Sequence, residues 1–104
     1  MREDGFAGVA ELAAIGTLVA DRTRCQILLA LLDGQKLSAS NLAAVAGVSA
    51  ATASSHLSKL ARAGLLRVEP EGRHRIYRIA RPEVADLIRA LEFFADPVRA
   101  ARGS

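Results

Sequence analysis

The fold of this chain is decided by residues 42–65, LAAVAGVSAATASSHLSKLARAGL, which predict two short helices joined by a sharp turn. Gly47 follows the first helix and Ser49 precedes the second. Glycine just past a helix and serine just before one are the usual stop and start signals. The stretch therefore predicts a second helix over residues 50–63.

This second helix is expected to bury one side and expose the other. Ala53, Leu57 and Leu60 recur at spacings of four and three residues, which places them on one apolar side. The opposite side carries small, hydroxyl-bearing and cationic residues, namely Ala51, Thr52, Ser55, Lys59 and Arg62. A helix with such an outward side fits the major groove of DNA. We therefore predict a helix-turn-helix whose second helix, called the reading helix below, contacts base edges.

Residues 65–79 change from helical to alternating periodicity. Residues 65–69 and 75–79 predict two strands, and Pro70-Glu71-Gly72 predicts the turn between them. A hairpin directly after a helix-turn-helix is the wing of a winged helix. Its tip and near flank carry Arg73, His74 and Arg75. Arginines there are expected to reach phosphates or the adjacent minor groove, whereas His74 either contacts a phosphate or has no role.

Three helices are expected before the reading helix. Residues 7–19 and 22–32 predict two of them, and Ser38 or Ser40 starts the third. Asp21 is expected to cap the second, because aspartate accepts hydrogen bonds from free main-chain N–H groups at a helix start. The residues expected to face the core from the second and third helices are Ile27, Leu28, Leu31, Leu32, Leu42, Val45 and Ala46.

A last helix is expected over residues 82–95, with Pro82 at its first position. Asp96-Pro97 should end it, and residues 99–104 are expected to fray. The first and last helices carry more apolar surface than the rest of the domain covers, which favours a symmetric dimer. The expected dimer interface is Val9, Leu12, Gly16, Val84, Leu87, Ile88, Leu91 and Phe94. A twofold dimer would place two reading helices about one DNA turn apart, matching a pseudo-palindromic operator.

Length and composition restrict the class of protein. The 104 residues are expected to form one domain, and 51% of them are hydrophobic, enough for a packed core. No apolar run approaches the roughly 20 residues of a membrane span, and the N-terminus lacks the order of a signal peptide, so we expect a cytoplasmic protein. Residues 49–79 carry a net charge of +4 in a chain of +3. This distribution is typical of a nucleic-acid binder; the alternative is a solvated basic face.

The chain resembles the ArsR/SmtB family of bacterial winged-helix repressors over about residues 10–95. Residues 21–28, DRTRCQIL, are similar to the Asp-Pro-Thr-Arg-x-x-Ile-Leu motif that begins the family's second helix, although Arg22 stands where proline is usual. The family's reading helix, its following strand and its wing are matched by residues 55–60, 63–66, 71–73 and 77–79. The resemblance implies a homodimer that represses transcription on double-stranded DNA and leaves its operator when an inducer, not identified by the sequence, binds.

The metal sites of this family do not match the chain. The resemblance puts one Cys-x-Cys pair at Ser38 and Ser40, whose hydroxyls are poor ligands for thiophilic ions. Another zinc site and a reading-helix cysteine pair would fall near Arg81, Glu83, Phe94, Lys59 and Ala63. Arginine, phenylalanine and alanine do not ligate zinc. We therefore expect no metal and no other cofactor.

The remaining reactive side chains leave alternatives open. Cys25, the only cysteine, is either a reactive thiol activated by Arg24 and a helix N-terminus or a small apolar core residue. His56 lies at the edge of the apolar side; it either donates to a DNA phosphate or packs as a satisfied histidine, and we count it among the DNA contacts. No phosphate loop, carboxylate pair or nucleophile elbow is present, so we expect no enzyme.

The sequence thus predicts one mostly helical winged-helix domain over residues 1–104, acting as a dimeric transcriptional repressor. The helix-turn-helix, the wing and the two dimerisation helices are expected at about residues 38–63, 65–79, 7–19 and 82–95. Ser49 and the first-turn amides are expected on a phosphate, and Ala51 on a thymine methyl group. The rival hypothesis is a winged helix for protein–protein interaction or scaffolding without an operator.

Overall fold

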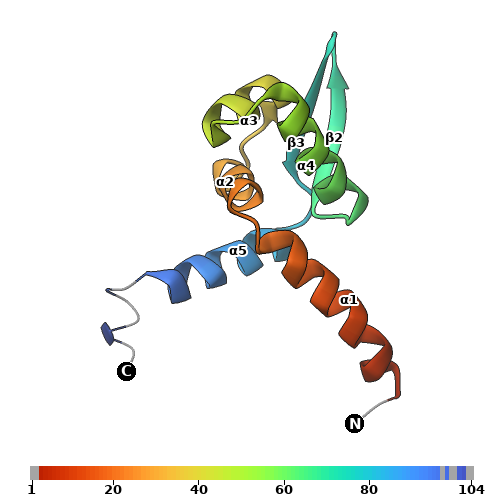
Figure 1. Cartoon of the computed structure of the whole chain (residues 1–104), viewed down its shortest axis with the longest axis vertical. Coiled ribbons are helices and arrows are strands. Elements are labelled where there is room, and N and C mark those ends of the chain that lie inside the picture. The colour runs from red at the N-terminus through yellow and green to blue at the C-terminus, as the bar shows by residue number, and fades with distance from the viewer. Residues whose placement is uncertain (1–2, 97, 99–100, 103–104) are drawn as a thin grey trace.

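The computed structural model describes residues 3–96, 98 and 101–102. Within them, helices and strands follow in the order α1(Glu3–Val19), α2(Arg22–Ala30), β1(Leu37–Ser38), α3(Ala39–Ala46), α4(Ala50–Arg62), β2(Leu66–Glu71), β3(His74–Ile79) and α5(Pro82–Ala95), as Figure 1 shows. The predicted winged helix-turn-helix is confirmed. α5 ends at Ala95 with Asp96 directly after it, as expected. Pro97 and most of residues 99–104, which were expected to fray, lie outside the described residues.

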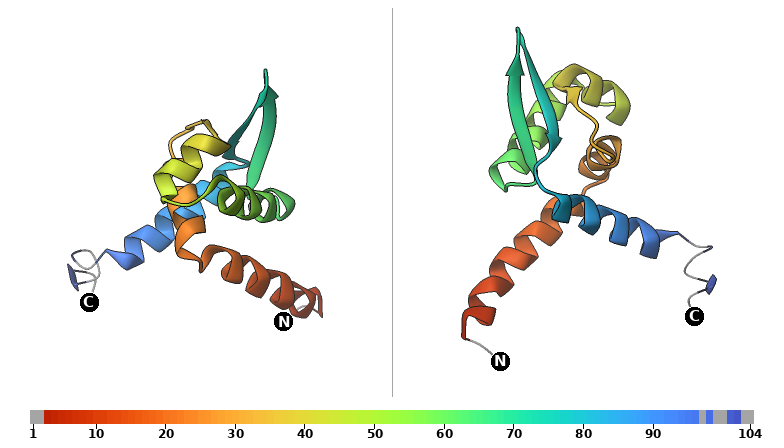
Figure 2. Two further views of the ribbon diagram at one scale, coloured as in Figure 1. Left: turned by 45° about the horizontal axis from the view of Figure 1, so that its top comes forward. Right: turned by 180° about the vertical axis from the view of Figure 1, so that it is seen from behind.

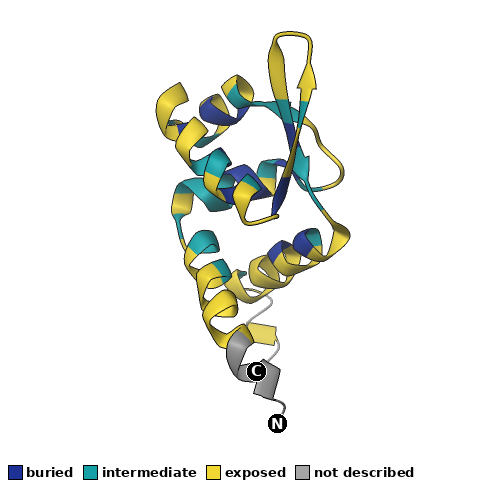
Figure 3. Ribbon diagram, turned by 90° about the vertical axis from the view of Figure 1, so that its right-hand side faces the viewer, coloured by how far each residue is buried: buried dark blue, intermediate teal, exposed yellow. Residues whose placement is uncertain are grey.

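The centre of the core is made by three helices. The side chains that are completely buried and largest are Ile27, Leu28 and Leu31 from the α2 segment, Leu42 from α3, and Leu57 and Leu60 from α4. In Figure 3 the buried residues lie where these helices meet the sheet, and the outer parts of α1 and α5 are exposed. The apolar periodicity of α2 and α4 therefore predicted the core correctly.

One core prediction on α3 is wrong. Val45 is 53% exposed, and Ala43 takes the inward position beside Leu42. Residues two apart on a helix point about 200° away from each other, so a helix that buries Ala43 must expose Val45. The face of α3 is set by the neighbours it packs against, α2 and α4.

The sheet is antiparallel, with β3 between β1 and β2. β1 is a strand that the sequence did not predict, because two residues are too short to show a period. The predicted turn is also corrected: Pro70 and Glu71 pair with Arg75 and His74, so the turn consists of Gly72 and Arg73. Gly72 has a φ of 61°, as a glycine at the first position of a two-residue hairpin turn requires.

α1 and α5 leave the core and diverge from each other, as the views in Figures 1 and 2 agree. Leu12 on α1 is 73% exposed and Phe94 on α5 is 76% exposed. The radius of gyration is 15.2 Å, whereas about 13 Å is usual for this length. Among the described residues, none of the helices combines the length and apolar character needed to cross a membrane.

The residues expected at the dimer interface fall into an exposed group and a buried group. Val9, Leu12, Leu87, Leu91 and Phe94 are exposed, and Gly16 is exposed beside them on α1. Val84 and Ile88 are only 8% and 6% exposed. The first half of α5 packs these two side chains into the chain's own core, so they offer little surface to a second copy.

Candidate nucleic-acid interface

The reading helix begins at a well-formed cap. The Ser49 Oγ atom accepts a hydrogen bond from the Thr52 main-chain N–H at 3.1 Å and donates to the Thr52 Oγ1 atom at 3.0 Å. Serine at this position satisfies one of the free N–H groups of the first turn. Thr52 keeps its own hydroxyl proton for an external acceptor, and the first-turn amides that precede it have no partner within the helix.

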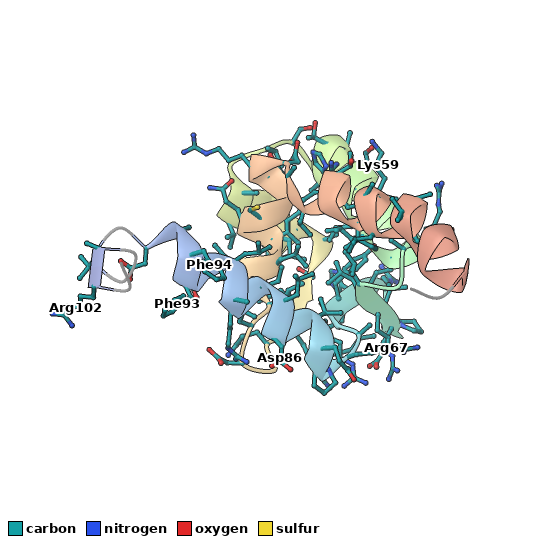
Figure 4. All side chains as sticks on the ribbon, turned by 90° about the horizontal axis from the view of Figure 1, so that it is seen from below. Lys59, Arg67, Asp86, Phe93, Phe94 and Arg102 are labelled. Atoms are coloured by element: carbon teal, nitrogen blue, oxygen red, sulfur yellow. The ribbon has the colours of Figure 1, made fainter. Side chains whose placement is uncertain are left out.

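α4 has a sharply divided surface. Ala53, Leu57 and Leu60 are completely buried. The predicted outward residues Ala51, Thr52, Ser55, Lys59 and Arg62 are all exposed. Lys59 stands at the surface in Figure 4, and Arg62 donates from Nη2 to the Ser58 Oγ atom at 3.1 Å. The outward side of α4 is therefore not used by the chain's own core.

The wing places further basic residues beyond the helices. Arg73 lies in the two-residue turn, and His74 and Arg75 begin β3; all three are exposed. Because side chains alternate along a strand, Arg75 shares the side of β3 on which Tyr77 reaches the core. Arg67 on β2 is also exposed. Its place between the apolar residues Leu66 and Val68 is the sequence pattern that could have added it to the predicted DNA contacts.

One basic residue of the wing is paired within the hairpin. The Arg78 Nε atom lies 3.3 Å from the Glu69 Oε1 atom on the neighbouring strand. This ion pair offsets part of the positive charge at the base of the wing. The exposed cations at and near the tip, Arg73 and Arg75, are the ones best placed to meet an anionic partner.

His56 differs from the other predicted DNA contacts because it is half-buried. The Arg24 Nη1 atom lies 2.9 Å from the His56 Nδ1 atom. The same guanidinium donates from Nε to the Leu18 carbonyl oxygen at 2.6 Å and from Nη2 to the Thr17 carbonyl oxygen at 3.5 Å. Sequence reasoning missed this contact between residues 24 and 56, although it singled out both residues.

Asp21 caps the N-terminus of α2, the helix that carries Arg24. Its Oδ1 atom accepts a hydrogen bond from the Arg24 main-chain N–H at 3.0 Å, which confirms the predicted N-cap of α2. This hydrogen bond, with the positive charge of Arg24, holds the pKa of the Asp21 carboxyl below its ordinary value. The carboxylate is therefore the form that the folded chain favours.

Cys25 lies beside an apolar hollow of about 250 Å³ between α2 and α5, which is also lined by Val19, Leu29, Ile88 and Leu91. Its Sγ atom donates to the Val19 carbonyl oxygen at 2.9 Å. The thiol is half-buried and already has a hydrogen-bond acceptor. Across the described part of the chain, no three histidine, cysteine, aspartate or glutamate side chains gather as a metal site would require.

Comparisons with known proteins agree on a helix-turn-helix. The family model described as a helix-turn-helix domain matches residues 19–69. The uncharacterized HTH-type transcriptional regulator YdfF of Bacillus subtilis is 45% identical over 80 residues, which cover 77% of this chain and 35% of YdfF. The HTH-type transcriptional regulator CmtR of Mycobacterium tuberculosis is 43% identical over 74 residues, which cover 71% of this chain and 62% of CmtR. The matched part of the chain thus spans about a third of the length of YdfF and less than two thirds of the length of CmtR.

A solved structure matches over most of both chains. It is the homodimeric winged helix-turn-helix DNA-binding domain Mb0332 from Mycobacterium bovis, determined by solution NMR and described as a possible ArsR-family transcriptional regulator. The TM-score is 0.81 and the sequence identity is 31%. The match covers 92% of this chain and 88% of that domain.

Proposed function

Because the chain belongs to the ArsR family of winged helix-turn-helix transcriptional regulators, we propose that it binds double-stranded DNA as a homodimer and represses transcription. The observation that carries the proposal is the outward side of α4, which is exposed along its length while the opposite side is completely buried. An exposed, capped helix bearing hydroxyl and cationic side chains suits the major groove.

The proposed contacts divide into two groups. Ala51, Thr52, Ser55 and Lys59 face base edges, with Ser49, the first-turn amides and Arg62 on adjacent phosphates. Arg73, His74 and Arg75 hold the wing on the DNA backbone or in the minor groove. His56 has one ring nitrogen engaged by Arg24, so only its other nitrogen is left for DNA.

The proposed dimer uses α1 and α5. Both helices expose large apolar side chains, with Leu12 on α1 73% exposed and Phe94 on α5 76% exposed, and exposed apolar patches often mark protein–protein contacts. A homodimeric relative of the same fold supports this assignment. The proposal includes release from a pseudo-palindromic operator by an inducer, and it gives Cys25 no sensing role because its thiol already donates to Val19.

Binding to a fluorescein-labelled random-sequence duplex, measured by anisotropy over a salt series, tests the proposed function. The expected result is binding whose logarithm falls linearly with the logarithm of salt concentration, because basic side chains displace counterions from phosphates. The rival function, a winged helix for protein–protein interaction, predicts no salt-dependent affinity for duplex DNA. Absence of such binding would decide in its favour.

A further inference from the structure

Arg24 joins three helices through one side chain. Its Nε and Nη2 atoms donate to the carbonyl oxygens of Leu18 and Thr17, in the last turn of α1. Carbonyls in the last turn of a helix lack partners within that helix. The Thr17 carbonyl also accepts from the Ala20 main-chain N–H at 3.3 Å, so the guanidinium adds to that bond and satisfies the Leu18 carbonyl. The remaining nitrogen, Nη1, reaches His56 in the middle of α4. The planar guanidinium therefore bridges the end of α1 and the reading helix.

The direction of the Arg24–His56 hydrogen bond follows from chemistry. A guanidinium has donors and no acceptor, and it stays protonated in proteins. The His56 Nδ1 atom, 2.9 Å away, must therefore be the acceptor. Nδ1 can accept only when the imidazole is neutral and carries its proton on Nε2. The contact exists only in that form of His56.

We propose that His56 is a positioning residue of the reading helix: its neutral ring, held by Arg24, fixes α4 against the end of α1, and acidification weakens DNA recognition by breaking this contact. The inference rests on the proposed DNA-binding function of α4. In this proposal His56 influences DNA binding through its hydrogen bond with Arg24 and not through a contact of its own with DNA.

The position of His56 on α4 explains why a shift there matters. His56 lies four residues after Thr52 and three before Lys59, so the three side chains follow one line along the helix. Thr52 and Lys59 are exposed on the proposed DNA side, whereas His56 is half-buried at its border. Any rotation or translation of α4 at His56 moves both neighbours relative to the groove.

The charges around His56 act in opposite directions. Arg24 faces it from α2, and Lys59 follows one turn later on α4; both side chains are cationic. Asp21, at the N-cap of α2, supplies the opposing negative charge. α1 faces the cluster with the carbonyls of Thr17 and Leu18, which Arg24 already occupies. A protonated His56 would lose its acceptor atom and repel the guanidinium, so Asp21 cannot preserve the hydrogen bond.

The test compares DNA affinity at about pH 7.5 and about pH 5.5, the range in which histidine ordinarily changes charge. The chain has two histidines, and a protonated His74 on a phosphate would strengthen binding in acid. The reference is therefore H74N, and the test variant is H56N/H74N. The probe is a duplex that the wild-type protein selects from a randomised pool at the higher pH, with a random-sequence duplex as the second arm.

The reference is expected to bind the selected duplex about three- to tenfold more weakly at the lower pH, a change typical of losing one hydrogen bond. H56N/H74N should show no such loss, because the asparagine carbonyl accepts from Arg24 at either pH. An equal loss in both variants, or tighter binding of the reference in acid, overturns the inference. Circular dichroism at both pH values must show that each variant remains folded.

Two further measurements separate positioning from direct contact. Long-range ¹H–¹⁵N spectra of the free protein at the higher pH should show His56 with its proton on Nε2; a proton on Nδ1 would refute the inference. In a double-mutant cycle, H56A and R24K should lose affinity non-additively, whereas additive losses would mean independent roles. If the wild type binds neither duplex, the proposed function fails; if it binds without acid weakening, only this inference fails.

Discussion

Single side chains determine where the helices of this chain begin. Asp21, Ser38 and Ser49 each accept a main-chain N–H from three residues later, at the starts of α2, α3 and α4. Each cap satisfies an N–H group that the helix itself cannot. These residues mark where α2, α3 and α4 begin through hydrogen bonds that are local in the sequence.

Asp21→Ala should lower the unfolding midpoint by a few degrees near neutral pH, because the α2 cap is lost. The folded chain lowers the pKa of Asp21, so its stabilising effect is present above the unfolded pKa and is lost as pH falls through the folded pKa. The gap between wild type and Asp21→Ala should therefore narrow below about pH 4. Thermal unfolding by circular dichroism, at one fixed protein concentration, measures both effects.

Asp21→Asn is the matched control for this prediction, because asparagine caps a helix as well as aspartate but does not titrate. At neutral pH it should be more stable than Asp21→Ala but slightly less stable than wild type, and its difference from Asp21→Ala should not change as the pH falls. A gap between wild type and Asp21→Ala that stayed constant into acid would show that the carboxylate charge is not what stabilises the start of α2.

At the scale of elements, α4 and the wing present basic residues by different means. α4 depends on helical periodicity to keep Lys59 outward while Leu57 and Leu60 are buried. The β2–β3 hairpin extends away from the helices, and its turn carries Arg73 at the tip (Figure 1). A contact at such a tip is expected to meet phosphates, which carry charge but no sequence information.

Arg73→Ala should weaken binding to selected and random duplexes by the same factor and reduce the slope of the salt dependence by about one unit. Anisotropy over a salt series on both duplexes measures the two quantities. Arg102→Ala removes the same charge at the C-terminal end of the described chain, beyond α5 and far from the wing (Figures 1 and 4), and should leave the slope unchanged. An unaltered slope in Arg73→Ala would remove Arg73 from the proposed phosphate contacts.

At the scale of the whole molecule, the two diverging helices α1 and α5 expose apolar side chains that the rest of the chain does not cover. Leu12 and Phe94 are each about three-quarters exposed, yet both lie on well-formed helices. Burying apolar surface is the main favourable term in protein association. A second copy related by a twofold axis would cover α1 and α5 and also duplicate the reading helix.

The chain should therefore sediment as a dimer at micromolar concentration, and Phe94→Asp should shift it towards monomer. A twofold interface loses the Phe94 contact twice, which costs about 3 kcal/mol or more and weakens dimerisation at least about a hundredfold. Val45→Asp is the matched control, because Val45 is also an exposed apolar residue but lies on α3. A wild type that sediments as a monomer, or equal effects of both substitutions, would refute the proposed interface.

The order of the helices and most of their bounds, the two sides of α4 and the presence of the wing could all be predicted from the sequence. These features depend on caps and periodicities that act within about four residues, so they can be recognised along the chain. The packing of the folded chain was needed to show that α3 buries Ala43 and exposes Val45, that β1 exists, and that the wing turns at Gly72-Arg73. It alone brought Arg24 to His56. Those outcomes depend on how whole elements pack, and contacts between residues distant in sequence leave no local pattern by which they could be predicted.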